Sequence, residues 1–237
     1  MKILLLKFRN IGDVLLSTPL VNNLRHHYPN AQIDFCVNKE TEAMLTLNPN
    51  LNKIITYDRI AIKSLTSIKR FWRELQFIRS FKKENYDVVI NLTSGDRGNL
   101  IAWVSNAPTR IGYSNKSWFF RRSLTHELPK QELRHTVDAS LDPLRLLNIP
   151  ISNKSVEIFW NSKDEQAISS ELTNINNFIH LHPVSRWLFK CISDNTMAQI
   201  IDYCQLNIGL KVVITASEDK FEVEKVNKIL SLTKSKP

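Results

Sequence analysis

The sequence is poor in glycine and cysteine and contains no long apolar run. Its 237 residues include five glycines, and none forms the GxGxxG or GxxxxGK[ST] pattern of dinucleotide or phosphate loops. The three cysteines form no CxxC pair, which disfavours disulfides and structural zinc and predicts reduced thiols in the cytosol. No stretch approaches the roughly 20 apolar residues that cross a bilayer, so we expect neither an integral membrane protein nor an exported one.

Several enzyme signatures are also missing. The sequence has no HExxH, GxSxG or EF-hand spacing, so hydrolytic zinc, serine hydrolase and calcium sites lose their support. Signatures of RRM, KH, homeodomain and zinc-finger modules are absent as well. Nucleic-acid binding therefore rests on charge alone.

Positive charge is abundant and unevenly placed. The chain carries 32 Lys and Arg against 23 Asp and Glu, a net charge of +9. Residues 59–84 hold eight basic and two acidic side chains, and residues 97–135 hold seven and two. The net charges of these two segments together exceed the net charge of the whole chain, so the rest of the chain is slightly acidic. A one-sided basic field predicts a phosphorylated small molecule, an anionic membrane face or nucleic acid as partner, although plain solubility is the simpler explanation.

Alternating strand and helix patterns predict an α/β fold with parallel sheets. Residues 2–8 and 32–38 are predicted strands around one helix whose apolar positions begin at Val14, which gives a β-α-β unit. Residues 51–57 are a possible third strand, and residues 64–83 a long amphipathic helix. A further strand over 86–92 leads through a polar loop into a helix beginning near residue 99.

The second half of the chain repeats the pattern with fewer elements. Residues 135–147 are predicted helical, and the Pro, Asn and Ser content of residues 148–153 marks a linker. We therefore expect domains at 1–150 and 151–237. Strands near 178–183 and 211–216 and helices over 195–204 and 218–232 follow the linker. Two strands are few for closing a core, so the second domain is expected to be incomplete.

Two loops carry candidate chemistry. Asp13 lies between the first strand and the first helix, at the sheet edge where ligands bind in open α/β folds. Its carboxylate could act as a general base, or it could simply cap the helix. Gly12 beside it would allow an unusual backbone angle or the close approach of a ligand. After the strand near 178–183, Ser185 and Lys190 suit a diphosphate, although an ordinary basic surface loop has the same composition.

Four segments in order resemble glycosyltransferase family 9, the ADP-heptose:lipopolysaccharide heptosyltransferases of Gram-negative bacteria, and within it the type III enzymes. They are KILLLKFRNIGDVLLSTPLVNNLR (2–25), NLTSGDRGNLIAWVSNAPTRIGY (91–113), RHTVD (134–138) and HPVSRWLFK (182–190). The similarity runs through essentially the whole chain. Four ordered motifs are far more specific than any one of them.

The resemblance implies a GT-B fold with two Rossmann-like domains, the N-terminal one for the acceptor and the C-terminal one for the nucleotide sugar. It implies inverting transfer of L-glycero-D-manno-heptose from ADP-heptose to the lipopolysaccharide inner core, without metal or cofactor. By position, Asp13 matches the catalytic base, and Ser185 and Lys190 match the residues that hold the donor diphosphate. His182 fits the same loop, and His135, which begins a helix, is expected to make a structural contact.

The resemblance also implies partners and a location. The basic N-terminal domain would meet the phosphorylated inner core, with Arg97, Arg121 and Arg122 as weak candidates for acceptor contacts, each of which is otherwise a solvated surface charge. Separately, the basic amphipathic pattern of the helix over 64–83 predicts peripheral attachment to the anionic cytoplasmic face of the inner membrane. Nucleic acid is not expected as a partner.

The sequence departs from the family pattern at two places, and these departures lead to an alternative function. Ile192 stands where the family usually has tryptophan, which predicts different packing around the donor phosphates. The family continues for on the order of 100 further residues, a length that would bring the second domain to the usual size. That part carries a D-S-x-x-x-H-like motif, so we expect a C-terminally truncated heptosyltransferase. The alternative function is an inactive chain that only binds anionic core oligosaccharide.

Overall fold

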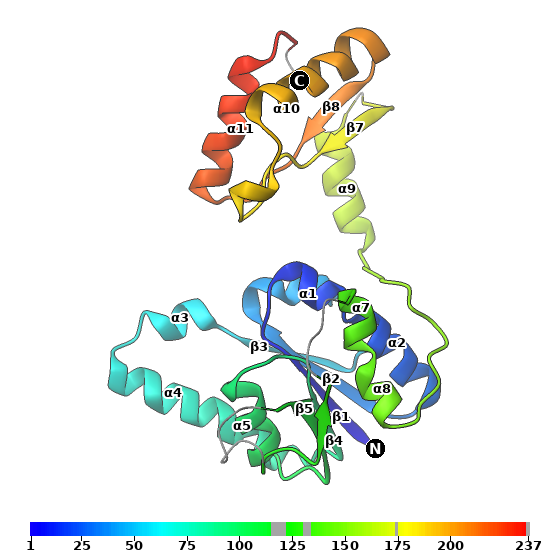
Figure 1. Cartoon of the computed structure of the whole chain (residues 1–237), viewed down its shortest axis with the longest axis vertical. Helices are drawn as coiled ribbons and strands as arrows, with labels where there is room; N and C mark the ends of the chain where they lie inside the picture. The colour runs from blue at the N-terminus through cyan, green and yellow to red at the C-terminus, as the bar shows by residue number, and fades with distance from the viewer. Residues whose placement is uncertain (115–121, 130–133, 174, 236–237) are drawn as a thin grey trace. The chain divides into compact units, whose positions relative to one another are not determined.

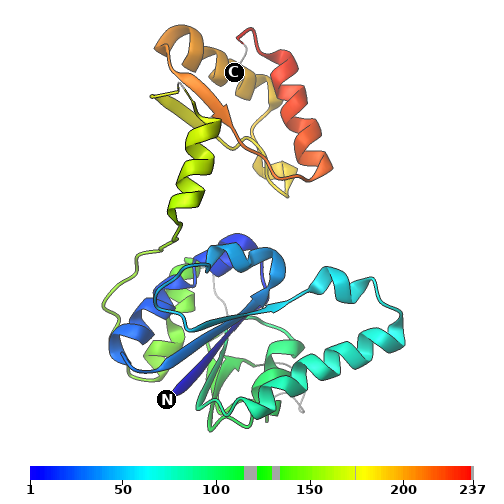
Figure 2. The ribbon, with the colours of Figure 1, turned by 180° about the vertical axis from the view of Figure 1, so that it is seen from behind.

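The computed structural model describes residues 1–114, 122–129, 134–173 and 175–235. Two compact units divide the chain, Met1–Asn161 and Ser162–Pro237. Each has its own parallel sheet with helices packed on it (Figures 1 and 2). The predicted α/β class with two parallel-sheet units is therefore confirmed.

The first unit is built on a six-stranded parallel sheet. Its strands are β1 (Lys2–Lys7), β2 (Gln32–Asn38), β3 (Lys53–Tyr57), β4 (Val88–Asn91), β5 (Thr109–Tyr113) and β6 (His126–Leu128). Their order across the sheet is β3-β2-β1-β4-β5-β6, and every neighbouring pair is parallel. The order reverses between β1 and β4, which creates the kind of switch point where open α/β sheets bind ligands.

Strand β1 is buried on both sides because its side chains alternate between two cores. Ile3 and Leu5 join one apolar cluster, and Leu4 and Leu6 join the other. Figure 1 shows helices α1 (Ile11–Leu15), α2 (Thr18–His27), α7 (Thr136–Ser140) and α8 (Asp142–Leu146) on one face of the sheet. Helices α4 (Ser67–Ser80) and α5 (Asp96–Val104) cover the other face. Short helical turns η1 (Lys39–Met44) and η2 (Phe81–Lys83) complete this unit.

Two predicted helices are divided in the structure. The helix after β1 was expected to be continuous, but it is α1 followed by α2, with a break at Leu16 and Ser17. Pro19 lacks the amide hydrogen that would bond to an earlier carbonyl. The hydroxyls of Ser17 and Thr18 bond to the carbonyl oxygens of Asp13 and Leu15 at 2.8 and 2.9 Å, which satisfies both groups at the break.

The predicted helix over 135–147 is likewise divided, because Pro143 lies in the first turn of α8. Before the long helix over 64–83, the structure adds the short helix α3 (Arg59–Lys63). Asp58 caps α3 by accepting a hydrogen bond from the Ala61 amide at 2.9 Å. The long helix itself is α4, followed by the turn η2.

The second unit holds strands β7 (Phe178–Leu181) and β8 (Lys211–Ile214), which pair in parallel. Its helices are α9 (Ser162–Glu171), α10 (Asp194–Tyr203) and α11 (Lys220–Leu232), with the helical turns η3 (Leu188–Lys190) and η4 (Cys204–Ile208). A small core joins α10, α11 and β8 through buried Ile201, Ile229 and Val212. The described part of this unit contains no third strand.

The stretch before α9 belongs with the first unit by its contacts. The side-chain oxygen of Asn23 accepts hydrogen bonds from the amide of Ser152 at 2.7 Å and from that of Asn153 at 3.2 Å. The Asn22 amide group donates to Glu157 at 2.8 Å. Residues 151–161 are therefore fastened to α2. The first compact unit ends at Asn161, eleven residues after residue 150, where the first domain was predicted to end.

Candidate functional site

Two loops meet at the switch point of the first sheet. The backbone amide of Phe8, after β1, donates to the hydroxyl of Thr93, after β4, at 2.9 Å. The Arg9 guanidinium donates to the Ser94 hydroxyl at 3.0 Å. These bonds join the carboxyl ends of β1 and β4 into one polar edge. Thr93 and Ser94 were not singled out from the sequence, although they follow a buried strand directly and the parallel topology brings them to this edge.

Asp13 lies in the first turn of α1, above that edge. Asn10 is the N-cap of the helix, and its backbone amide donates to the Asp13 carboxylate at 3.4 Å. This capping-box contact confirms the helix-capping alternative as one role of Asp13. The contact is long, and the side chain is only half-buried, so the carboxylate is open to a second hydrogen-bonding partner.

The Gly12 backbone does not adopt the unusual angle that the sequence suggested. Among the described glycines only Gly95 and Gly209 have positive φ, whereas Gly12 continues the helix. A Cβ built on Gly12 meets no atom within 4 Å. The expectation of a special conformation is therefore wrong, and what remains of the prediction is open space beside Asp13 that a ligand can approach.

Lys7 is a buried cation at the end of β1. Its side chain is almost fully enclosed, and its ammonium donates to the carbonyl of Leu92 at 3.2 Å. Burial lowers the pKa of Lys7, and the nearby Asp13 carboxylate opposes that shift. Lys7 thus supports the loop after β4 and lies near enough to Asp13 for the two charges to interact. The sequence signal was a lysine directly after the apolar run Ile3 to Leu6.

Buried amides hold the loop after β4 from below. The Asn91 side chain donates to Asn99 on α5 at 2.8 Å and accepts from the Thr93 amide at 3.1 Å. Gly98 makes this packing possible, because a Cβ there would lie 2.3 Å from the Asn91 side chain. The loop after β4, which is bonded to the loop after β1, is therefore rigidly based on β4 and α5.

Arg97 is occupied by protein partners. Its guanidinium bonds to Glu74 of α4 at 2.9 Å and to the Tyr57 hydroxyl at 2.8 Å, and it stacks 4.0 Å above the Tyr57 ring. The Tyr57 hydroxyl also bonds to Glu74, and burial together with this bond raises the pKa of Tyr57 to about 12. Arg97 therefore ties β3, α4 and α5 together. Arg122 lies exposed in the turn before β6, and Arg121 falls outside the described residues.

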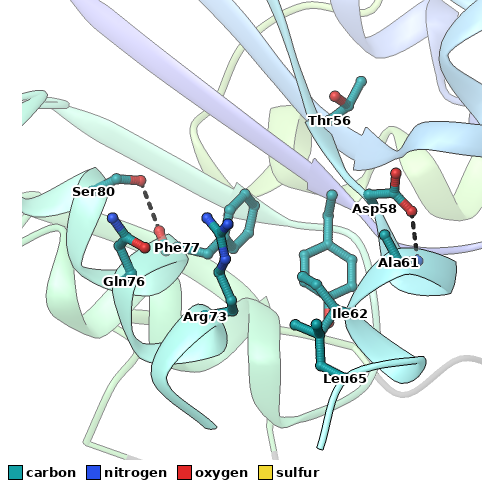
Figure 3. Close-up of a pocket in the computed structure, with 10 residues that line it drawn as sticks. Thr56, Asp58, Ala61, Ile62, Leu65, Arg73, Gln76, Phe77 and Ser80 are labelled. Atoms are coloured by element: carbon teal, nitrogen blue, oxygen red, sulfur yellow. Dashed lines mark hydrogen bonds between the residues drawn. The ribbon is translucent and has the colours of Figure 1, made fainter. Parts of the chain in front are cut away.

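A hollow of about 480 Å³ lies between α3 and α4, next to Tyr57. Figure 3 shows its residues: Phe77, Ile62 and Leu65 present apolar surface, and Arg73, Gln76 and Ser80 line it from α4. Asp58 and Thr56 close the end nearest β3. This hollow lies on the most basic segment of the chain.

The loop after β7 is the second candidate site. His180 and His182 each lie within hydrogen-bonding distance of the Thr215 hydroxyl, at 2.8 and 3.1 Å. Thr215 directly follows β8, and its amide donates to the carbonyl of Leu181 at 3.0 Å. These contacts fix the start of the loop at the carboxyl ends of β7 and β8. His182, the first residue of the family-like segment 182–190, is thereby held at the end of β8.

Ser185 and Lys190 lie in the same loop, and each has its own contact within that loop. The Ser185 hydroxyl oxygen accepts a long hydrogen bond from the Trp187 amide at 3.4 Å. Lys190 ends η3, is exposed, and its ammonium lies 6.0 Å from the centre of the Phe189 ring. Trp187 and Phe189 are 54% and 81% exposed, so the loop presents aromatic surface beside its lysine. Ile192 is exposed just after it.

The remaining candidates are structural. The His135 ring accepts from the Val137 amide at 3.3 Å and so caps α7, as expected. All three cysteines are free thiols, and burial raises the pKa of Cys36. Within the described ranges there is no group of three His, Cys, Asp or Glu side chains arranged to hold a metal ion. No helix among them is long and apolar enough to cross a bilayer.

Comparison with curated proteins finds lipopolysaccharide heptosyltransferases. Lipopolysaccharide heptosyltransferase 3 of Escherichia coli is 28% identical over 224 residues, which cover 92% of this chain and 64% of the relative. Lipopolysaccharide core heptosyltransferase OpsX of Haemophilus influenzae is 21% identical and is covered to 63% of its length. The chain thus spans somewhat less than two thirds of the length of these relatives.

Solved structures show the same fold. A glycosyl transferase family 9 protein from Veillonella parvula has a TM-score of 0.85 and 24% identity, over 100% of this chain and 68% of that one. Heptosyltransferase WaaC of E. coli, solved with ADP-2-deoxy-2-fluoro heptose, has a TM-score of 0.74 and 14% identity, with 97% and 73% coverage. The fold class is therefore α/β of the GT-B type. Residues 74–237, more than half of the sequence, match the family model, so the chain belongs to glycosyltransferase family 9, the heptosyltransferases.

Proposed function

We propose that this chain transfers L-glycero-D-manno-heptose from ADP-heptose to the lipopolysaccharide inner core, with inversion at the anomeric carbon. The observation that carries the proposal is Asp13, whose half-buried carboxylate lies at the switch point of a family 9 sheet. The relatives named as lipopolysaccharide heptosyltransferases support the substrate class.

In the proposed reaction the Asp13 carboxylate takes the proton of an acceptor hydroxyl. The hydroxyl oxygen then forms the new bond to the anomeric carbon of the donor heptose, while the bond from that carbon to the ADP phosphate oxygen breaks. A positioned general base contributes roughly 10²–10⁴ to such a rate. Lys7 assists by donating to the carbonyl of Leu92 and so holding the loop after β4 in place.

Negative charge moves onto ADP as it departs, so a cation at the diphosphate stabilises the transition state. We assign that role to Lys190, and we assign to the Ser185 hydroxyl a hydrogen bond that it donates to a phosphate oxygen. The long bond between Ser185 and the Trp187 amide leaves the serine hydroxyl hydrogen available for a phosphate oxygen. Because Lys190 supplies the charge, the proposal requires no metal ion or cofactor, and transfer is expected to survive chelation with EDTA.

The experiment is mass spectrometry of an inner-core acceptor incubated with ADP-heptose and the 237-residue chain. Addition of one heptose, with release of one ADP, is the expected result. Acceptor that binds in a salt-sensitive manner but gains no heptose would support the alternative, a chain that only binds anionic core oligosaccharide. If the folded protein neither binds the acceptor nor transfers heptose to it, the result contradicts the proposed substrate.

A further inference from the structure

Glu74, near the middle of α4, holds two residues that belong to other elements. Its carboxylate accepts hydrogen bonds from the Arg97 guanidinium at 2.9 and 3.3 Å, so the ion pair is bidentate. It also accepts a hydrogen bond from the hydroxyl of Tyr57, the last residue of β3. The Arg97 guanidinium in turn donates to the Tyr57 hydroxyl at 2.8 Å. Glu74 thus ties the end of β3 and the first turn of α5 to α4.

The two partners of Glu74 both contact the side chain of Phe8. The Arg97 guanidinium lies 5.7 Å from the centre of the Phe8 ring and 4.0 Å from the centre of the Tyr57 ring. The Phe8 and Tyr57 rings pack edge to face, with their centres 6.0 Å apart. Phe8 is therefore in contact with two groups whose positions Glu74 fixes.

Phe8 begins the loop that leads from β1 to Asp13. It is the first residue after the strand, and its amide is bonded to the Thr93 hydroxyl after β4. Asn10, two residues later, is the N-cap of α1, and its amide donates to the Asp13 carboxylate. A displacement of Phe8 would therefore move the start of α1 and the direction in which Asp13 points.

We propose that Glu74 is a positioning residue: through the contacts of Phe8 it fixes where the Asp13 carboxylate lies. Without the Glu74 carboxylate, the hydroxyl of the buried Tyr57 loses its acceptor and the Arg97 cation loses its counter-charge. Both groups then turn to other partners, and Phe8 is no longer held. Misplacing a reacting group by about 1 Å can lower a rate roughly 10²-fold. The inference rests on the proposed function, because that function makes Asp13 the base.

The first test measures amide hydrogen exchange in the full chain and needs no substrate. In Glu74→Ala we expect the amides of residues 8–16 to exchange roughly tenfold faster than in the parent chain, while residues 2–6 keep their rates. The matched control is Glu84→Ala, because Glu84 pairs with Lys2 at 2.6 Å at the opposite end of β1. It should leave residues 8–16 at their parent rates. Unchanged exchange in Glu74→Ala, or equal acceleration in both variants, would overturn the proposal.

A second variant protects this test against a loss of folding. Glu74→Gln keeps the size of the side chain and removes its charge, so the Arg97 pair is weakened while the packing stays. It should change amide exchange in the same direction as Glu74→Ala, by a smaller factor. Thermal unfolding of each variant checks that it is folded.

The second test measures transfer in a double-mutant cycle. Glu74→Ala should lower kcat roughly 10- to 100-fold with KM for both substrates unchanged, whereas Glu84→Ala keeps the parent kcat. Because the effect passes through Phe8, Glu74→Ala should lower kcat little further in a Phe8→Leu chain. An equal loss in both backgrounds, or a raised acceptor KM with unchanged kcat, would overturn the proposal. A parent kcat in Asp13→Asn would instead contradict the proposed function, and amide exchange alone would then decide whether Glu74 positions Asp13.

Discussion

At the scale of single residues, Lys190 supplies the charge that the proposed reaction needs only when ADP departs. Its ammonium is exposed and close to the Phe189 ring, so replacing it leaves the fold unchanged. We expect Lys190→Gln to lower kcat by roughly 10²–10³, as when one electrostatic donor is removed from an active site. Steady-state kinetics of ADP release measures this, with Lys211→Gln as the control. An unchanged kcat would remove Lys190 from the donor site.

Gly12 offers a second test beside Asp13. A Cβ at this helical position meets only open space, so Gly12→Ala should leave the unfolding temperature equal or slightly raised. If an acceptor approaches closely there, the added methyl group raises KM for the acceptor and leaves KM for ADP-heptose unchanged. Equal KM for the acceptor in both proteins would show that no ligand comes near Gly12.

The sequence indicated some of these residues better than others. Asp13, Ser185 and Lys190 directly follow or lie close behind apolar strands, where the chain order alone shows the sheet edge. Lys7 and Thr93 could not be assigned roles in that way, because their meaning depends on β1 and β4 being neighbours although 80 residues separate them. Arg97 was a candidate for acceptor binding because of its charge, and only the structure shows Glu74 and Tyr57 around it.

At the scale of elements, Asp194 joins α10 to α11. Its carboxylate bonds to Lys225 and, at 3.0 Å, to Lys228, and these two bonds lower the pKa of Asp194. A carboxyl whose pKa is lowered in the folded state stabilises the fold above its ordinary pKa. The contribution is lost as the pH falls through the lower, folded value. Asp194→Asn should therefore destabilise the second unit by roughly 1 kcal/mol at neutral pH.

The pH dependence distinguishes this ion pair from simple packing. The difference in unfolding temperature between the parent chain and Asp194→Asn should shrink below about pH 4 and vanish in stronger acid. Glu224→Gln is the control, because Glu224 is exposed and its carboxylate lies as far as 3.9 Å from the Lys220 ammonium, so this pair is weak. A difference that persists in acid would mean that the side chain acts through packing rather than charge.

Elements with strong apolar patterns were predicted close to their observed bounds. The strand over 32–38 coincides with β2, and the helix over 195–204 differs from α10 by one residue at each end. Strands β5 and β6 were not predicted, since TRIGY and HEL contain few apolar residues. Strand β5 pairs with β4, and β6 pairs with β5, so both depend on neighbours in the sheet. The break between α1 and α2 depends on hydroxyl bonds that helical periodicity does not report.

At the scale of the whole molecule, residues 151–161 act as part of the first unit. Asn23 is fully buried, and its amide oxygen has partners only in Ser152 and Asn153 within the described residues. A fragment ending at residue 150 would lose these hydrogen bonds, each of which contributes about 0.5–1.5 kcal/mol. A fragment of residues 1–161 should therefore unfold at a higher temperature than one of residues 1–150. Equal unfolding temperatures would place the boundary at the predicted linker.

In the proposed reaction, the carboxylate of Asp13 acts as the base in heptose transfer. The most direct measurement compares kcat for ADP-heptose and an inner-core acceptor in Asp13→Asn and Asp138→Asn. Both aspartates occupy the third position of a short helix, so both variants lose a similar capping charge. We predict a kcat lowered roughly 10²–10⁴-fold for Asp13→Asn and nearly unchanged for Asp138→Asn. Equal kcat values in the two variants would contradict the proposed role of Asp13 as the base.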